Sequence, residues 1–335
     1  MDKKRLIWAD SLKGWLIILV VLGHAIQNAM GTNCESSHLW NLIYSFHMPA
    51  FMAVSGYLAF RPIVMGGGIN TCWATINRRF QQLIIPFLIW TALLMLVKGN
   101  FSWYTIKTYL LYPDGGLWFL WVLFFINVLF IMGSWLAESL KIKQEVVILF
   151  ICLLLAGVMV VFEPRMFGFQ FIAYYFLFYS MGYYFNKNKE KFITKNPFII
   201  VALTLCWFVL AWFWKMHELP SWLVFIPLPA TMMQYAYRFI TAAIAIYILL
   251  AISPMVLNSE KWLNKPFVRL GAISLGIYTT HFILIGRIVK LFTGFGLGEA
   301  LTVIVAFIIA LLVSWMIVWL LSKWRITSRL MLGKI

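Results

Sequence analysis

His24 stands inside a run of apolar residues that extends from Trp15 to Ile26. An ionisable side chain in such a run is costly within a membrane unless it faces the protein interior, and it usually serves function. Lys13 precedes it by eleven residues, and eleven steps of about 100° return close to the starting direction, so both side chains share one helix face. The rise between them is about 16 Å, roughly half of a hydrocarbon core. The spacing predicts a cation at the membrane surface and an imidazole at depth.

Two further histidines, His47 and His281, lie in other apolar runs. At about 1.5 Å per residue and with alternating helix directions, all three histidines lie about 17–18 Å from the same membrane face. Histidine exchanges protons near neutral pH, which suits it to general base catalysis. We therefore predict His24 as the base, with His47 or His281 steadying an oxyanion or orienting an acceptor. The alternative is that each histidine only hydrogen-bonds a neighbouring helix, which contributes about 1 kcal/mol.

A zinc site built from three histidines is a competing hypothesis for this layer. No carboxylate falls at the same depth, and no two histidines are spaced four residues apart on one helix. We therefore predict no metal. The four cysteines, at positions 34, 72, 152 and 206, show neither metal-binding nor redox spacing, and they predict no disulfide framework.

Arg78 and Arg79 precede the third apolar run, at its expected helix N-terminus. Two guanidinium groups there interact unfavourably with the positive end of the helix dipole, and an anionic partner would offset this repulsion. The pair predicts a phosphate-bearing ligand that is also bound by Lys13. The alternatives are ordinary cytosolic cations or anchors for lipid phosphates. Asp10 is a candidate catalytic carboxylate, or it pairs with Lys13 three residues later.

The elements that must carry these residues are membrane helices. The chain has 335 residues, of which 63% are hydrophobic and 11% charged, whereas soluble domains carry roughly 25% charged residues. Apolar runs long enough to cross a bilayer occur near 12–30, 39–60, 80–97, 117–136, 146–162, 169–185, 198–214, 237–253, 270–289 and 299–321. The sequence predicts an all-α polytopic membrane protein of about ten helices, with a single domain over residues 1–335 and no appended soluble domain.

Most of the 27 Lys and Arg residues fall in alternate connections and in both terminal segments. This bias places both termini in the cytosol. The basic start followed by an apolar run also resembles a signal peptide, but no convincing cleavage site follows, so we interpret it as the first span. The net charge of +16 is spread in short clusters between spans, which argues against nucleic-acid binding.

Small residues and a proline predict how the second span packs. Pro49 removes a backbone donor and predicts a kink. Ser55 and Gly56 predict close approach of another backbone.

Several motifs together identify a family. They are Asp10-Ser-Leu-Lys13-Gly14 with His24, Phe46-His47-Met48-Pro49 with Ser55-Gly56-Tyr57-Leu58, Arg78-Arg79 with Pro86, Leu117-Trp118-Phe119-Leu120, and Ile273-Ser274-Leu275-Gly276-Ile277-Tyr278 with His281. In this order, and across essentially the whole chain, they resemble the acyltransferase-3 family of membrane proteins.

The resemblance implies a multi-pass protein of the inner (cytoplasmic) membrane with about ten helices. It implies transfer of an acyl group, commonly acetyl, from cytosolic acyl-CoA to a hydroxyl of a surface polysaccharide, glycan precursor or lipid-linked sugar. By resemblance His24 is the essential histidine, and Arg78, Arg79 and Trp118 belong to the donor-binding region. Lys13 stands where the family usually has arginine, which keeps the charge but loses bidentate recognition.

The sequence is compatible with more than one mechanism and with a second function. Direct transfer and a covalent acyl-histidine relay are both compatible with the sequence. A proton-coupled transporter of an anionic or glycan-related solute is the main rival, but it predicts inverted repeats that are not visible. Acyl-CoA, a glycan acceptor and membrane lipids are the expected partners; the oligomeric state is open, with a homodimer as one option.

Overall fold

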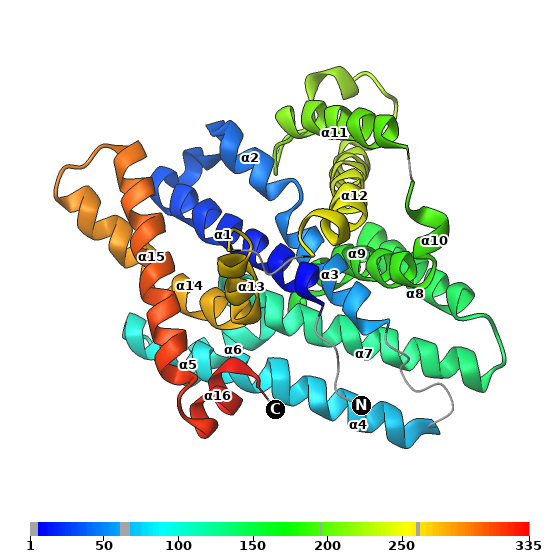
Figure 1. The fold of residues 1–335 in the computed structure, drawn as a ribbon, viewed down its shortest axis with the longest axis horizontal. Coiled ribbons are helices and arrows are strands. Elements are labelled where there is room, and N and C mark those ends of the chain that lie inside the picture. The colour runs from blue at the N-terminus through cyan, green and yellow to red at the C-terminus, as the bar shows by residue number, and fades with distance from the viewer. Residues whose placement is uncertain (1–5, 61–67, 195, 259–261, 335) are drawn as a thin grey trace. The chain divides into compact units, whose positions relative to one another are not determined.

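A computed structural model of the chain describes residues 6–60, 68–194, 196–258 and 262–334 (Figure 1). All regular structure in these ranges is helical, and they contain no strand. Residues 1–5, which contribute to the prediction of a cytosolic N-terminus, lie outside the described ranges. The all-α prediction is confirmed.

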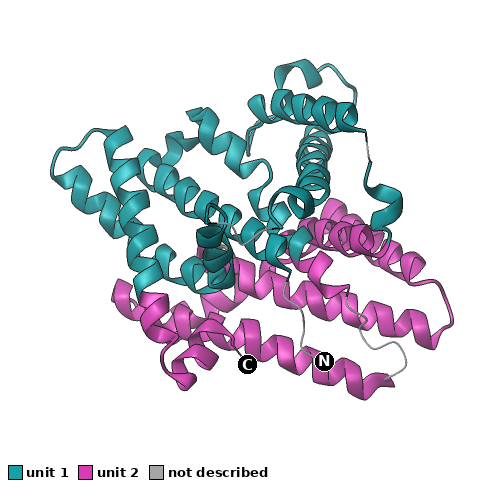
Figure 2. Ribbon diagram, viewed as in Figure 1, with its two compact units in different colours: residues 1–54, 188–316 teal, residues 55–187, 317–335 magenta. Residues whose placement is uncertain are grey.

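The described residues form two compact units (Figure 2). The first unit comprises residues 1–54 and 188–316, and the second comprises 55–187 and 317–335, so that the boundary divides α3 and α15. The helices that belong wholly to the first unit are α1 Ile7–Met30, η1 Gly31–Ser36, α2 His38–Tyr44, α10 Lys189–Phe192, α11 Pro197–Trp212, η5 Ser221–Leu223, α12 Ala230–Val256, α13 Lys265–Ala272 and α14 Ser274–Gly294.

The second unit holds the middle of the chain and its last helix. Its helices are α4 Gly68–Arg79, η2 Phe80–Ile84, α5 Ile85–Lys98, α6 Trp103–Leu111, η3 Pro113–Gly115, α7 Trp118–Ser139, α8 Gln144–Phe162, η4 Met166–Gly168, α9 Phe169–Lys187 and α16 Arg325–Leu332. The divided helices are α3 His47–Ala59 and α15 Glu299–Leu321.

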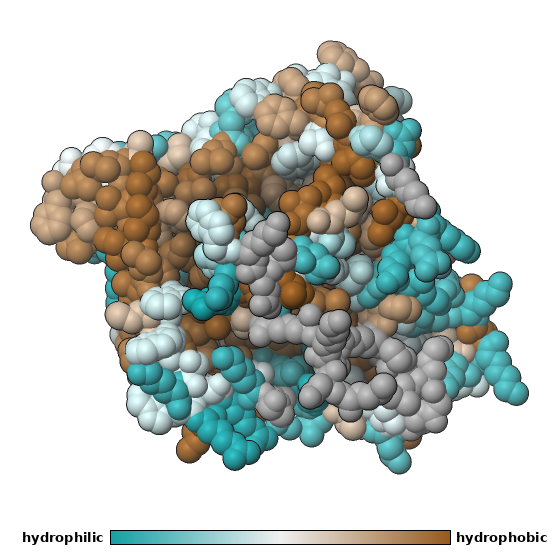
Figure 3. Space-filling view, viewed as in Figure 1, coloured by the Kyte–Doolittle hydropathy of each residue, from teal (hydrophilic) through white to brown (hydrophobic). Residues whose placement is uncertain are grey.

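The described residues include eight helical stretches that are long and apolar enough to cross a membrane. They are Ile7–Ser36, His38–Ala59, Gly68–Lys98, Trp118–Ser139, Gln144–Phe162, Ala230–Val256, Ser274–Gly294 and Glu299–Leu321. The two other predicted spans fall on α9, which is rich in tyrosine, and on α11, whose 16 residues span only about 24 Å. Large apolar side chains are exposed along α15, where Figure 3 shows a hydrophobic surface. The chain is a polytopic membrane protein.

Three predicted spans are interrupted helices. The second breaks at Ser45 and Phe46, because Pro49 has no N–H to offer the carbonyl of Ser45 one turn earlier. The third begins at Gly68 rather than at residue 80, and it passes through a π-helical turn at Phe80–Ile84. The ninth breaks at Ile273, between α13 and α14.

In the first unit, α1 packs along α13 and α14 through glycines. A Cβ built on Gly14 would lie 2.0 Å from the carbonyl oxygen of Phe267, and one on Gly271 would lie 1.7 Å from that of Asp10. Only glycine permits backbones to approach this closely. The ring of Trp15 stacks on Phe267 with centroids 3.9 Å apart. The start of α1 is therefore fixed rigidly against α13.

In the second unit, α7 is packed against α4, α8 and α9. Phe130 of α7 is fully buried and meets the rings of Tyr179 and Tyr183 from α9. A Cβ on Gly56 would lie 1.9 Å from the carbonyl oxygen of Tyr179. The close backbone approach predicted at Ser55–Gly56 is confirmed.

Candidate functional site

The first unit brings the three predicted histidines together around Tyr44. The rings of His24 in α1 and His281 in α14 have centroids 5.3 Å apart. The ring of Tyr44 lies 4.7 Å from that of His47 and 6.4 Å from that of His24. His47 and His281 are almost completely buried. The layer predicted from depth along the sequence is thus a real cluster of side chains, which we call the histidine cluster.

Local backbone geometry fixes the proton position on two of these rings. His47 Nδ1 lies 2.7 Å from the carbonyl oxygen of Ile43, and His281 Nδ1 lies 2.8 Å from that of Ile277. A carbonyl oxygen can only accept a hydrogen bond, so each Nδ1 carries the hydrogen. In the neutral rings Nε2 is therefore a lone-pair acceptor.

His281 Nε2 is buried and has no hydrogen-bond partner among the residues that the structure describes. Unsatisfied polar atoms are rare in protein interiors and often mark functional positions. A neutral ring with its hydrogen on Nδ1 accepts a hydrogen bond at Nε2 and does not donate one there. The geometry favours the predicted role of orienting an acceptor, in which these atoms accept a hydrogen bond from an acceptor hydroxyl.

Gln27 and Tyr44 connect the cluster to its surroundings, and the sequence prediction missed both as positioning residues. Tyr44 Oη donates to Gln27 Oε1 at 2.8 Å, and Gln27 follows His24 by three residues on α1, so both side chains lie on one helix face. A Cβ on Gly23 would lie 2.8 Å from the Tyr44 ring, so glycine allows the ring to reach α1. The position of Gln27 three residues after His24 was a usable signal, since such pairs face one another.

Lys13 and Asp10 form an ion pair at the start of α1, with Nζ 2.7 Å from Oδ1. Asp10 precedes His24 by fourteen residues, or about 21 Å of helix. The carboxylate is therefore distant from the histidine cluster, and the catalytic role predicted for it has no geometric support. The geometry agrees with the alternative, in which Asp10 holds Lys13.

Arg78 and Arg79 lie in the last turn of α4, in the second unit. The helix already begins at Gly68, so the argument from a helix N-terminus is wrong for this pair. The turn that follows supplies a neutral partner instead, because Arg79 Nη1 donates to Gln82 Oε1 at 3.2 Å. Arg78 is exposed and Arg79 half-buried, so that both charges remain accessible for an anion.

Trp118 begins α7 in the same unit. Its ring stacks on Phe171 and Tyr175, with centroids 4.7 and 5.2 Å away. Phe80, which directly follows Arg79, meets Phe124 of α7 at 5.9 Å, about 9 Å along the helix from Trp118. Trp118 is therefore part of an aromatic stack in the same unit as the arginine pair.

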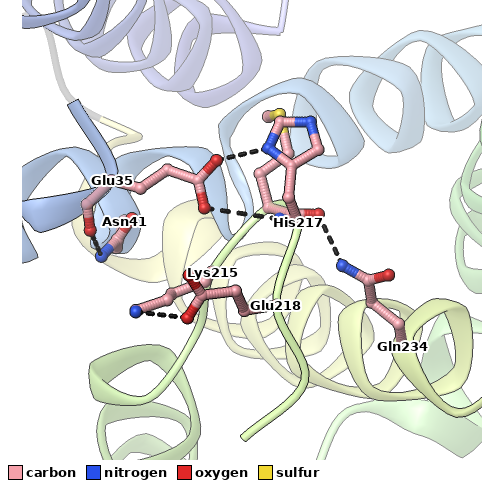
Figure 4. Close-up of polar contacts among 7 residues, drawn as sticks. Glu35, Asn41, Lys215, His217, Glu218 and Gln234 are labelled. Carbon is pink, nitrogen blue, oxygen red and sulfur yellow. Dashed lines mark hydrogen bonds and ion pairs between the residues drawn. The ribbon is translucent and has the colours of Figure 1, made fainter. Parts of the chain in front are cut away.

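A polar clasp fixes the segment after α11 in the first unit (Figure 4). The imidazole and backbone N–H of His217 meet the carboxylate of Glu35, Gln234 Nε2 donates to the carbonyl of Met216, and Lys215 pairs with Glu218. The clasp follows Trp214, which is 1% exposed and lies 6.4 Å from Trp40. Trp214 is thus a core residue, whereas Trp103 and Trp222 are exposed.

Within the described ranges no three His, Cys, Asp or Glu residues form a group that could hold a metal ion. In the histidine cluster, His47 and His281 engage backbone carbonyls through Nδ1, and the ring of Tyr44 lies beside His24 and His47.

Comparison with known proteins places this geometry in a family. A family model described as an acyltransferase domain matches residues 6–319. The chain belongs to the acyltransferase-3 family. This membership confirms the resemblance inferred from the motifs, and it agrees with the predicted acyl-transferring enzyme.

Two relatives of this chain are nodulation proteins. The nodulation protein NolL of Sinorhizobium fredii is 32% identical over 194 residues, which cover 54% of this chain and 49% of that protein. The nodulation protein NolL of Mesorhizobium japonicum is 33% identical over 124 residues, covering 34% of this chain and 32% of that protein. The chain thus matches half or less of the length of these relatives. No solved structure matches it.

Proposed function

We propose that this chain is an O-acyltransferase of the inner membrane. It would move an acyl group, with acetyl the expected one, from cytosolic acyl-CoA to a hydroxyl of a surface polysaccharide, glycan precursor or lipid-linked sugar. The observation that carries the proposal is the contact of His24 with His281 inside a chain of the acyltransferase-3 family. The proposal treats residues 1–335 as a single acyltransferase domain.

His24 acts as the general base in this proposal. It takes the proton of the acceptor hydroxyl as the oxygen attacks the thioester carbonyl, the C–S bond breaks, and the proton passes to the departing thiolate. The Nε2 atoms of His47 and His281 accept hydrogen bonds from the acceptor, since their Nδ1 atoms are engaged by backbone carbonyls. A relay through acyl-histidine would use the same residues.

The donor is bound through its phosphates by Arg78 and Arg79, whose side chains have no carboxylate partner among the described residues. Guanidinium groups suit phosphate because they present paired N–H donors. Trp118 contributes an aromatic surface in the same unit. In this proposal Lys13 binds the phosphates of the acyl donor less strongly, because Asp10 already neutralises its charge.

The experiment that tests the proposal uses purified protein and radiolabelled acetyl-CoA. Wild type should transfer or slowly hydrolyse the acetyl group, and His24→Ala should lower the rate about 10²–10⁴-fold, the range expected for loss of a general base. The matched control is His38→Ala, because His38 stacks on Trp212 outside the histidine cluster. Solute flux without thioester consumption would contradict the proposal and favour a transporter. Mass spectrometry of surface glycans with and without the protein would identify the acceptor.

A further inference from the structure

The last described helix, α16, is docked on the segment that follows the arginine pair. Within the second unit, α16 contacts both η2 and α5. The indole Nε1 of Trp90 in α5 donates to the carbonyl oxygen of Met331 at 2.8 Å. Leu332 is buried, while Ile326 is exposed. The end of the chain is thereby fixed to the turn directly after Arg79.

Gly333 makes the closest of these contacts. A Cβ on this residue would lie 2.3 Å from the backbone carbonyl oxygen of Gln82, and the backbone has φ +63°. Both the space and the conformation therefore favour glycine. The segment after α16 therefore packs directly against the backbone of Gln82.

Gln82 and its neighbour Gln81 link this docking to two guanidinium groups. The side chain of Gln82 accepts a hydrogen bond from Arg79 Nη1 at 3.2 Å, and that of Gln81 accepts one from Arg329 Nη2 at 2.9 Å. Consecutive Cα atoms are about 3.8 Å apart. Arg79 and Arg329 are separated by 250 positions in the chain, yet each donates to one of two consecutive glutamines in the same π-helical turn. Such turns are rare in helices and are frequent at functional sites.

The partners of these guanidinium groups are neutral amides. Elsewhere in the described chain, Lys13, Lys187 and Lys215 are paired with carboxylates. No carboxylate pairs with Arg78, Arg79 or Arg329 among the residues described. An amide orients a guanidinium group without cancelling its charge, so the arrangement retains its attraction for an anion.

We propose that Arg329 is a third guanidinium ligand for the phosphates of the acyl donor, and that α16 positions the arginine site. The ligand chemistry is a diphosphate or phosphomonoester, as in a nucleotide-bearing thioester. The proposal rests on the proposed function, because it extends the donor site to a residue outside the motifs that identify the family. Gln81, Gln82 and Gly333 are positioning residues in this site.

Binding of coenzyme A to protein in dodecyl maltoside, a detergent without phosphate, tests the proposal. Arg329→Ala should raise the dissociation constant for coenzyme A about tenfold, as expected for the loss of one charge-assisted contact. The same substitution should raise the dissociation constant for pantetheine, which lacks the nucleotide, much less. In turnover, the KM for acetyl-CoA should rise about tenfold, with kcat reduced less than about twofold.

Two sets of variants separate binding from folding. Lys323→Ala removes the same charge from a side chain that lies over Trp319, and it should bind coenzyme A like wild type. Gln81→Leu should weaken binding less than Arg329→Ala, and the double variant should be no weaker than Arg329→Ala alone, because both changes remove one contact. Gly333→Ala should weaken coenzyme A binding even where its melting temperature is preserved.

The outcomes are distinguishable. If wild type binds coenzyme A and Arg329→Ala binds it equally well, the role of Arg329 is overturned and the proposed function stands. Equal weakening for coenzyme A and pantetheine would also overturn it, because it would show general damage. If Arg329→Ala instead loses only binding to phosphatidylglycerol nanodiscs, the residue is a lipid ligand and the proposal fails. If wild type neither binds coenzyme A nor uses acetyl-CoA, the proposed function itself fails.

Discussion

At the scale of single residues, a proton on His24 disfavours a second proton on His281. Two unit charges 5.3 Å apart, the distance between the His24 and His281 ring centroids, repel each other by about 3 kcal/mol at an effective dielectric constant of 20. A positive charge on His24 is therefore favoured where His281 is neutral. The Nδ1 contacts of His47 and His281 keep the neutral rings oriented as acceptors. The cluster is thus suited to a single base with two oriented acceptors.

Removal of the Tyr44 hydroxyl should lower activity without loss of stability. Tyr44→Phe keeps the ring between Trp40 and the histidines but removes the hydroxyl that donates to Gln27. Loss of one hydrogen bond of about 1 kcal/mol should lower kcat about three- to tenfold through misorientation of His24. Steady-state kinetics with acetyl-CoA measures the effect, and the thermal midpoint should change little.

A matched variant checks that interpretation. Tyr247→Phe removes a hydroxyl that donates to the carbonyl of Phe192, away from the cluster, and its kcat should equal that of wild type. Gln27→Leu should reproduce the Tyr44→Phe loss, and the double variant should add little. Additive losses would show that the two residues act separately and would contradict the linkage.

At the scale of elements, glycine contacts between helices determine where the polar groups lie. The packing of α1 on α13 brings the backbone of Asp10 into contact with Gly271. This contact fixes the position of the ion pair between Asp10 and Lys13. A break between α13 and α14 then redirects the chain into the helix that carries His281. The start of α1 and the histidine of α14 are thereby held by one continuous piece of packing within the first unit.

Gly271→Ala should therefore destabilise the protein. The added methyl group would lie 1.7 Å from a backbone carbonyl oxygen, where no side chain can move aside. Overpacking of this kind typically costs about 1–3 kcal/mol. Unfolding in sodium dodecyl sulfate should begin at a lower detergent fraction. The control is Gly157→Ala in α8, where no described neighbour lies within 4 Å and helix propensity favours alanine by up to about 1 kcal/mol; equal midpoints for the two variants would contradict the packing argument.

At the scale of the whole molecule, hydropathy was sufficient to predict the helices and the histidine layer. Each apolar run predicted as a span falls on one or two helices. The depth of His24, His47 and His281 followed from the fixed rise of a helix, because the bilayer makes helix direction alternate. These features depend on local composition alone, which a single sequence contains.

Other features depend on contacts that local composition does not encode. The polar residues of α4, such as Asn70 and Asn77, hide the true start of the third helix at Gly68, so Arg78 and Arg79 were placed at the wrong position in it. The contact of Arg329 with Gln81 joins positions 248 residues apart. The orientation of the His47 ring depends on a helix break whose position Pro49 only approximates.

Membrane orientation is a prediction for the molecule as a whole, since it decides which side supplies each substrate. In a cysteine-free background, Asn100→Cys tests the connection after α5, and Lys143→Cys tests the one after α7; both positions are exposed. The excess of Lys and Arg in alternate connections predicts that position 100 is outside and position 143 in the cytosol. An impermeant thiol reagent should therefore label Asn100→Cys in intact cells and Lys143→Cys only after permeabilisation.

The reverse labelling pattern would invert the proposed reaction. The arginines precede α5 and Asn100 follows it, so labelling of Lys143→Cys from outside would place the arginine end of that span away from cytosolic acyl-CoA. Labelling of both positions in intact cells would show an even number of crossings between them, whereas α7, the one candidate span described between these positions, predicts a single crossing. Only labelling of position 100 from outside and position 143 from inside lets the donor meet Arg78 and Arg79 in the cytosol while an acceptor arrives from the other face.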